Sequence, residues 1–321
     1  MIREFIVNSF LCYRDRITSA YIKKEFDFNK NNIISFLPSE GITGIGNMMA
    51  NIILGIYFAQ TYGYTYHLLW QAPFKYSDIF QPTDLIKLHT HKLYISSFHY
   101  DAAVTLRYGN SLDEHFDKDN TPIHNPSLFE TELAKKRYNR LLSKDNQSLK
   151  SIFLYHWTLR VISPLSAKIT LSKLKIKKNI INKVNTFINK HKIDKTWIGL
   201  HIRATDCPAA IKDSSGIYRY IKDNPDKKFF VCSDDRQVEE KLCSLPNAFH
   251  RAKKFYTIYN KATNSVKRVR FDYVEAFIDV LILSRTTLGE NIIRAHGPRD
   301  PFGSTFFQLA YYYNMLESLP V

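Results

Sequence analysis

The sequence predicts an α/β protein of two domains, each with a parallel sheet covered by helices. Short apolar strands alternate with helix-forming segments along most of the 321 residues. Strand, turn, helix and strand follow one another over residues 33–70, the order of a βαβ unit. A lysine-rich segment near residue 165 separates predicted domains of residues 1–165 and 166–321. We expect the two domains to face one another across a cleft.

The N-terminal half contains the predicted βαβ unit and several shorter elements. We expect strands at residues 33–37, 64–70 and 92–98, and helices at about 47–62 and 127–143. Gly44 and Gly46 precede the first of these helices, with Asn47 as its expected cap. This "TGIGNMMA" segment matches neither the dinucleotide fingerprint nor the Walker A loop. It indicates a close backbone approach at the cleft.

The C-terminal half continues the alternation. A basic amphipathic helix within residues 168–195 leads into a strand at 196–204, and further strands are expected at 227–235 and 286–291. Helices are expected at residues 214–224, 235–245, 272–285 and 304–316, with a short segment around 255–260. Ligands of such parallel sheets bind at the carboxyl ends of the strands.

The chain is basic, with 45 Lys and Arg against 30 Asp and Glu, a net charge of +15. Nucleic acid, an anionic membrane surface or a phosphorylated small molecule would each suit this charge. In residues 168–195 the apolar residues recur at helical spacing, so the lysines form a solvated face, a membrane-surface patch or a nucleic-acid contact. Tyr311, Tyr312 and Tyr313 follow a helical pattern rather than a basic strand face, so we expect no nucleic acid partner.

The cysteines and the apolar runs indicate the compartment. Four cysteines are scattered without metal-ligand spacing, as in a reduced intracellular chain. The N-terminal apolar run is interrupted by charges, and no run of apolar residues is long enough to span a bilayer. We expect a cytoplasmic protein, with peripheral membrane contact left open.

The segment "IGLHIRATDC" places polar side chains at the end of an apolar strand. The Arg203 guanidinium presents a planar fork that matches phosphate oxygens. Alternatively, Arg203 pairs with Asp206 in an internal ion pair that holds the loop. His201 alternates with Leu200 and Ile202, so it is either part of the site or a core histidine.

Similar polar groups follow other predicted elements. Asp234 and Asp235 end the strand of "FVCSDD" and would either accept hydrogen bonds from a nucleoside or cap the next helix. Ser304 and Thr305 begin the last helix, where they would form an anion site or a simple N-cap. Asp279 interrupts an apolar helix, which indicates a buried polar role, such as holding a backbone turn or Arg203.

The motifs taken together resemble the GT-B fucosyltransferase superfamily, which includes α1,2- and α1,6-fucosyltransferases, the nodulation fucosyltransferase and protein O-fucosyltransferases. "HIRATD" is similar to its first motif, H-[VI]-R-x-x-D, with Ala204 in place of a second basic residue found in many members. "FFVCSDD", the helix with Asp279, "LSRTTLGEN" and "GSTFFQLAYY" are similar to the later motifs, and "GIGNMMANIILGIYFAQ" to the opening turn and helix. The resemblance spans residues 40 to 312. Arg294 or Arg299 would supply the positive charge missing at Ala204.

The resemblance implies a GT-B-like fold and an inverting transferase that moves fucose from GDP-fucose to a glycan or small acceptor hydroxyl. The N-terminal domain would hold the acceptor and the C-terminal domain the nucleotide sugar. No D-x-D sequence stands at the plausible strand ends and no metal-binding motif is present, so neither a divalent metal nor another cofactor is expected. The alternatives are a GT-B transferase with another nucleotide-sugar donor and a non-catalytic nucleotide-binding protein of the same fold.

The resemblance also assigns roles to individual residues. Arg203 would grip the β-phosphate and stabilise the departing GDP, and Asp206 and His201 would shape its loop. Asp213, in the loop expected after the motif, is the candidate base, so the catalytic set is Arg203, Asp206 and Asp213. The donor-binding set is His201, Arg203, Thr205, Ser233, Asp234, Asp235, Asp279, Ser304, Thr305 and Phe306. The cleft loop is Gly44, Gly46 and Asn47.

Overall fold

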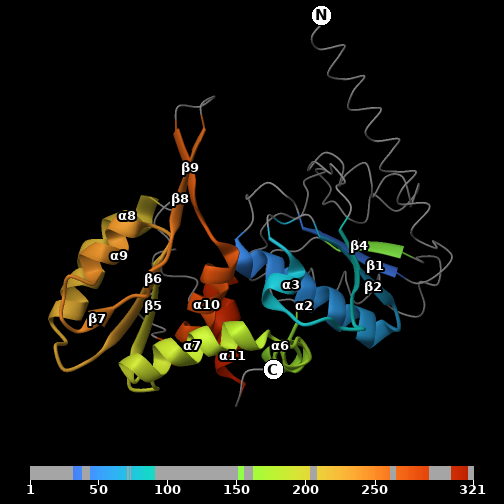
Figure 1. Ribbon diagram of the computed structural model, residues 1–321, viewed down its shortest axis with the longest axis horizontal. Coiled ribbons are helices and arrows are strands. Elements are labelled where there is room, and N and C mark those ends of the chain that lie inside the picture. Colours follow the sequence, from blue (N-terminus) through green and yellow to red (C-terminus); the bar gives the residue numbers. More distant parts are fainter. Residues whose placement is uncertain are drawn as a thin grey trace, which may run out of the picture. The chain divides into compact units, whose positions relative to one another are not determined.

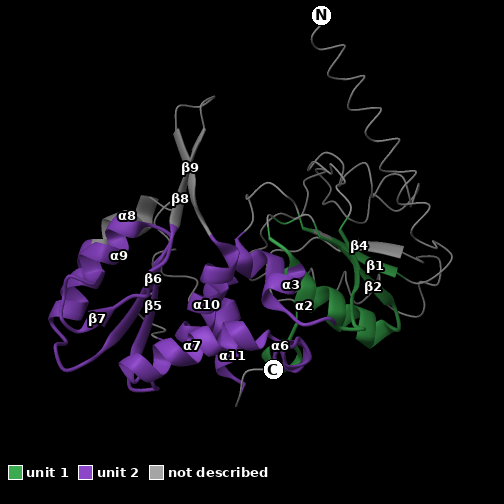
Figure 2. Cartoon of the chain, in the orientation of Figure 1, with its two compact units in different colours: residues 1–43, 50–75, 83–167 green, residues 44–49, 76–82, 168–321 purple. Residues whose placement is uncertain are grey.

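The computed structural model describes residues 32–37, 44–70, 72, 74–90, 151–154, 162–202, 208–260, 265–288 and 305–316 (Figure 1). The expected strand at 92–98 and helix at 127–143 lie outside these residues. The chain forms two compact units (Figure 2). Unit 1 comprises residues 1–43, 50–75 and 83–167, and unit 2 comprises residues 44–49, 76–82 and 168–321.

Unit 1 contains a parallel sheet with the strand order β3-β2-β1-β4. Its strands are β1 (Asn32–Leu37), β2 (Thr65–Trp70), β3 (Lys87–His89) and β4 (Ser151–Leu154). Helix α2 (Ile45–Tyr62) connects β1 to β2, as the βαβ pattern predicts. A Cβ on Gly55 would lie 2.2 Å from the Tyr66 ring, so the glycine lets the helix lie against β2.

Unit 2 contains a second parallel sheet, with the order β10-β5-β6-β7. Its strands are β5 (Ile198–Ile202), β6 (Phe229–Ser233), β7 (Ala248–Phe249) and β10 (Thr287–Leu288). Its helices are α3 (Tyr76–Ile79), α7 (Lys178–His191), α8 (Pro208–Lys222), α9 (Arg236–Leu242), α10 (Tyr273–Leu283) and α11 (Thr305–Asn314). Helix α6 (Pro164–Ser172) precedes α7. Strands β8 (Phe255–Asn260) and β9 (Ser265–Phe271) pair antiparallel with one another and form a separate two-stranded sheet.

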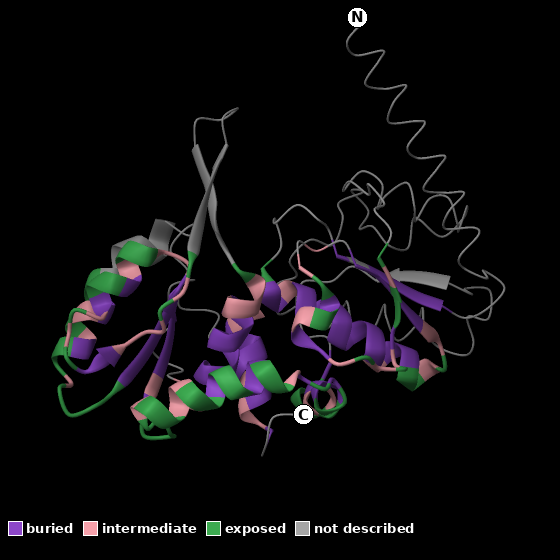
Figure 3. Ribbon diagram, viewed as in Figure 1, coloured by how far each residue is buried: buried purple, intermediate pink, exposed green. Residues whose placement is uncertain are grey.

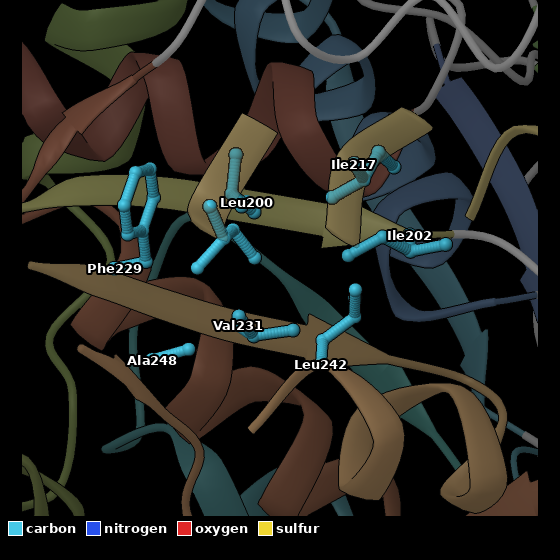
Figure 4. Packing of buried hydrophobic residues seen from close by; sticks show 8 residues of the cluster. Leu200, Ile202, Ile217, Phe229, Val231, Leu242 and Ala248 are labelled. Atoms are coloured by element: carbon cyan, nitrogen blue, oxygen red, sulfur yellow. The ribbon is translucent and has the colours of Figure 1, made fainter. Parts of the chain in front are cut away.

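Helices cover both faces of the unit 2 sheet. Side chains of successive strand residues point to opposite faces, so an apolar strand presents apolar residues to both. Leu200 of β5 and Val231 of β6 pack on one face with Ile217 of α8 and Leu242 of α9 (Figure 4). On the other face, Phe230 meets the ring of Phe187 of α7 edge-on, at a centroid distance of 5.9 Å. This arrangement is the layered α/β architecture that the alternating pattern predicts.

Aromatic packing ties α3 to the C-terminal helices within unit 2. The Phe80 ring meets Phe277 of α10 edge-on at 5.4 Å, and Phe277 meets Tyr313 of α11 at 5.7 Å. Phe80 also forms an antiparallel bridge with Ile176. All four of these residues are buried, so residues 76–82 contribute to the core of unit 2.

The structure differs from the sequence-based expectations at several points. Helix α2 begins at Ile45, so Gly46 and Asn47 lie within its first turn, whereas Gly46 was expected to precede the helix and Asn47 to cap it. Residues 168–195 hold the end of one helix, α6, and the whole of another, α7, rather than one amphipathic helix; Ile176 between them takes part in the bridge to Phe80. Helix α8 begins at Pro208, because proline suits the first helical position, so Asp213 lies in a helix and not in a loop. The last helix begins at Thr305 rather than Ser304. The β8–β9 pairing was not predicted, because the charges of "SVKRVRF" obscure its strand pattern.

Burial along α7 follows the expected amphipathic pattern (Figure 3). Ile180, Ile181 and Val184 are buried, and the lysines of this helix are exposed. Among the described helices, none combines the length and the apolar character needed to cross a membrane.

Candidate functional site

The candidate site lies at the carboxyl edge of the unit 2 sheet, where β5 and β6 end. His201 is the penultimate residue of β5 and is buried, and Ser233 is the last residue of β6. Because the two strands are parallel, their carboxyl ends lie at the same edge. Arg203, Thr205, Asp206 and Ser304 lie outside the described residues, as do Arg294 and Arg299.

The first turns of α2 and α11 meet in unit 2. A Cβ on Gly46 would lie 2.4 Å from the backbone carbonyl carbon of Thr305 and 2.5 Å from the backbone nitrogen of Phe306. The Thr305 hydroxyl donates a hydrogen bond to Oδ1 of Asn47. Gly44 differs, since a Cβ there would meet no described atom within 4 Å. Gly46 therefore makes a close backbone approach to the start of α11, and the cleft at which such an approach was expected stays a prediction.

The contact between α2 and α11 brings two helix N-termini together. The first N–H groups of a helix have no partner within the helix, and the helix dipole places partial positive charge there. Such ends favour anions, phosphates in particular. Where the two helices meet, at Gly46 and Thr305, both helix dipoles contribute partial positive charge.

The end of β5 joins this pair of helices through an aromatic stack. The imidazole of His201 lies parallel to the ring of Phe306, with centroids 4.3 Å apart and an interplanar angle of 13°. His201 is 8% exposed, so the strand end and the α11 start are held at one place. The structure thus brings together His201, Gly46, Asn47, Thr305 and Phe306, whose positions in the sequence span 260 residues.

The turn after β6 is fixed by its own side chains. The Asp235 backbone N–H donates to Oγ of Ser233 at 3.1 Å. Oδ1 of Asp235 accepts hydrogen bonds from the N–H groups of Gln237 and Val238 at 2.8 and 3.1 Å, so of the two alternatives for this residue, the helix cap is the one present. Asp234 is half-buried beside it. A nucleoside contact for Asp234 remains a prediction.

Asp279 lies in a buried cluster of charges that the sequence did not predict. Lys253 donates to Oε1 of Glu239 at 2.6 Å and to Oδ2 of Asp279 at 2.7 Å. The three side chains are only 1–3% exposed. Burial alone would lower the pKa of Lys253, but Asp279 and Glu239 outweigh it and raise that pKa above its ordinary value. The Lys253 ammonium is therefore held charged between two carboxylates.

Arg251 completes the compensation of charge on α10. Its Nε donates to Oδ1 of Asp279 at 2.9 Å, its Nη1 pairs with the Glu275 carboxylate, and its Nη2 donates to the Glu275 carbonyl at 2.8 Å. On the other side, Nδ1 of His250 lies 3.3 Å from Oε2 of Glu239, and this carboxylate raises the pKa of His250. Nζ of Lys183 also lies 3.5 Å from Oε1 of Glu275, so three cations and a histidine face three carboxylates.

The cluster also supports the end of β6. Oε1 of Glu239 accepts a hydrogen bond from the Ser233 backbone N–H at 3.0 Å. Glu239 therefore connects the strand end to Lys253 and, through it, to Asp279. The sequence signal for Glu239 is its helical spacing from Leu242, three positions later, which places both residues on one side of α9. Both are buried in the structure.

A second polar group lies in unit 1. Nδ1 of His67 is 3.0 Å from Nε2 of His89, and its Nε2 is 3.2 Å from Oδ1 of Asn32. Burial, together with the charges of His89 and Lys87, lowers the pKa of His67 to about 4. His67 is therefore neutral at neutral pH.

The sequence predicted that no metal ion is needed and that Asp213 is the base. Across the described ranges, no three His, Cys, Asp or Glu side chains are arranged to hold a metal ion. Metal independence remains a prediction. Asp213 lies within α8, but the placement of its side chain is outside what the structure describes.

Comparison with known proteins identifies the fold. No family model matches the chain, and no curated protein matches it. Among solved structures, NodZ α1,6-fucosyltransferase soaked with GDP-fucose aligns over 88% of this chain and 92% of its own, with 15% identity and a TM-score of 0.54. The form co-crystallised with GDP gives 16% identity, the same coverage and a TM-score of 0.54. The fucosyltransferase NodZ from Bradyrhizobium gives 15% identity, again over 88% and 92%, and a TM-score of 0.53. The predicted resemblance to GT-B fucosyltransferases is confirmed at the level of the fold.

Proposed function

We propose that this chain is a glycosyltransferase that transfers fucose from GDP-fucose to the hydroxyl of a glycan or small acceptor, with inversion at the sugar carbon. The fold is shared with a fucosyltransferase whose structures were obtained with GDP-fucose and with GDP. Fold alone does not determine function. The proposal therefore depends on the site.

The observation that carries the proposal is the meeting of α2, α11 and the end of β5. Gly46 and Thr305 bring two helix N-termini into contact, and Phe306 stacks on His201 beside them. A diphosphate carries negative charge that such N-termini stabilise. Arg203 follows His201 by two residues, so the proposal adds a guanidinium to the same edge of the sheet.

In the proposed reaction, the acceptor hydroxyl attacks C1 of fucose from the face opposite the diphosphate. The bond between C1 and the phosphate oxygen breaks, and the electron pair leaves with GDP. Arg203 pairs with the β-phosphate and stabilises this leaving group as its charge develops. Positive side chains and backbone N–H groups replace a metal in this role. Asp213 is the proposed acceptor of the hydroxyl proton.

The remaining residues are assigned to positioning. Asp206 and Thr205 hold the loop of Arg203, and Asp234 contacts the nucleoside. Asp235 and Asp279 already accept hydrogen bonds from other residues of the chain, so in this proposal they maintain the shape of the donor site.

The first test is calorimetric titration of GDP into the wild-type chain with EDTA present. We expect micromolar binding, and we expect Arg203→Ala to weaken it at least tenfold, because a charged hydrogen-bonded pair is worth about 1.5–3 kcal/mol. Arg219→Ala is the matched control, since Arg219 is an exposed arginine of α8. Equal affinity in the Arg203→Ala variant would contradict the proposed role of Arg203. Absence of GDP binding to the wild type would refute the donor.

A second test concerns chemistry. GDP-fucose should be consumed in the presence of a suitable acceptor, and other nucleotide sugars should compete weakly. Faster turnover of another nucleotide sugar would show a different donor. Tight GDP binding without consumption of GDP-fucose across a broad acceptor panel would show a non-catalytic nucleotide-binding protein.

A further inference from the structure

The segment of residues 164–193 is strongly basic. It contains eight lysines and neither an aspartate nor a glutamate. It includes α6 and α7 together with the extended residues between them. Among its lysines, Lys173, Lys175 and Lys178 are exposed. A run of this kind attracts anionic surfaces, and the attraction is strongest at low ionic strength.

The same segment exposes large apolar side chains. Leu165 is 59% exposed and Ile169 is 48% exposed, and only one other large hydrophobic residue, Leu88, is comparably exposed within the described ranges. Leu165 and Ile169 are four positions apart on α6, so they lie on the same face of this helix. Ala167 and Leu171 are fully buried, so the helix has one apolar side toward the core and a second toward solvent.

We infer that α6 and the lysines that follow it form a docking surface for an anionic lipid bilayer. In this arrangement Leu165 and Ile169 enter the boundary between headgroups and acyl chains, and the lysines pair with anionic headgroups. Such a surface uses both the exposed apolar side chains of α6 and the lysines that follow. The inference goes beyond the proposed transferase activity and does not depend on it.

Charge complementarity by itself would also fit a nucleic acid. A phosphate backbone, however, offers nothing to two exposed aliphatic side chains, and sites for single-stranded nucleic acid combine basic residues with aromatic stacking platforms. In α6 the exposed apolar residues are aliphatic. The described surface therefore favours lipid.

The experiment is co-sedimentation of the full chain with vesicles of phosphatidylcholine, with and without phosphatidylglycerol. We expect binding only to the anionic vesicles, and weaker binding at high salt. The variant Lys173→Gln/Lys175→Gln/Lys178→Gln should lose about a hundredfold in affinity, at roughly fivefold for each lysine. The matched control, Lys222→Gln/Lys227→Gln/Lys241→Gln, removes the same charge from exposed lysines elsewhere in unit 2 and should retain most of the binding.

A second variant, Leu165→Ser/Ile169→Ser, tests the apolar part. It should reduce binding to anionic vesicles several-fold while leaving the circular dichroism spectrum and GDP affinity unchanged. Equal losses in the two lysine variants would overturn the inference, because net charge would then explain the binding. So would equal binding to neutral vesicles, or binding to single-stranded RNA in place of vesicles. Because GDP affinity is measured separately, failure here leaves the proposed function intact.

Discussion

Replacement of Lys253 by methionine should destabilise unit 2 strongly. The ammonium makes two hydrogen bonds, at 2.6 Å to Glu239 and 2.7 Å to Asp279, with its side chain 2% exposed. Each hydrogen bond to a charged group is worth about 1.5–3 kcal/mol, and the loss of one member of a buried pair costs about 3–5 kcal/mol. Arg251 remains on Asp279 and the Ser233 N–H remains on Glu239, which favours the lower end. We expect a loss of about 3 kcal/mol.

The assay is thermal unfolding followed by circular dichroism. A loss of about 3 kcal/mol corresponds to a decrease in Tm of roughly 6–12 °C for a unit of this size.

Two comparisons make this prediction refutable. Lys254 is the next residue and is exposed, so Lys254→Met should change the free energy of unfolding by no more than about 0.5 kcal/mol. Adding Glu239→Gln to Lys253→Met removes the carboxylate charge that Lys253 had balanced, and it should recover part of the lost free energy of unfolding. If Lys253→Met and Lys254→Met had equal effects, or if the double variant lost the sum of the two single losses, the buried pair would not be a significant source of stability.

Three further predictions follow from the geometry of single residues. Gly46→Ala should cost about 1–3 kcal/mol and weaken GDP binding, since its Cβ would lie 2.4 Å from the backbone of Thr305. Gly44→Ala, whose Cβ would meet no described atom within 4 Å, is the calorimetric control, and equal GDP affinities of the two variants would contradict this account. Asp235→Ala should lower the free energy of unfolding in urea by about 1 kcal/mol through loss of the α9 cap. Asp235→Asn should retain most of this stabilisation, and equal losses in the two variants would argue against a cap. The pKa of His67 is lowered to about 4 in the fold, so the unfolded chain binds the proton first as pH falls. Stability should therefore decrease by on the order of 1–2 kcal/mol between about pH 6.5 and about pH 4, after discounting for solvent screening. His67→Asn should flatten the dependence of Tm on pH in this range, and an unchanged slope would count against the assignment.

The sequence predicted those parts of the fold that depend on local pattern. Strands β5 and β6 lie within their expected ranges because each contains a run of apolar residues, 198–200 in β5 and 229–232 in β6. Helix α10 is within one or two residues of its prediction, since Asp272 caps it and eight consecutive residues after Glu275 are buried. By contrast, the start of α8 was misplaced, because proline can begin a helix as readily as it ends one.

The arrangement of the site depended on contacts that no local pattern contains. Asn47 and Thr305 are 258 residues apart in the chain and share a hydrogen bond. Lys253 finds its two carboxylates 14 and 26 residues away, on different helices. The sequence marked Asp279 as a buried polar residue, but its partners follow from the positions of β7 and α10 in the folded unit.

The membership of residues 44–49 and 76–82 in unit 2 has a practical consequence for dissecting the chain. A fragment beginning near residue 166 would contain the whole β10-β5-β6-β7 sheet and yet lack Gly46, Asn47 and Phe80. Its core would be missing the fully buried Phe80 side chain, and the Thr305 hydroxyl of α11 would lack the Asn47 side chain that accepts its hydrogen bond. Gene truncation would therefore yield an incomplete unit 2, and a separable unit 2 would have to be built by grafting both short segments back through engineered linkers.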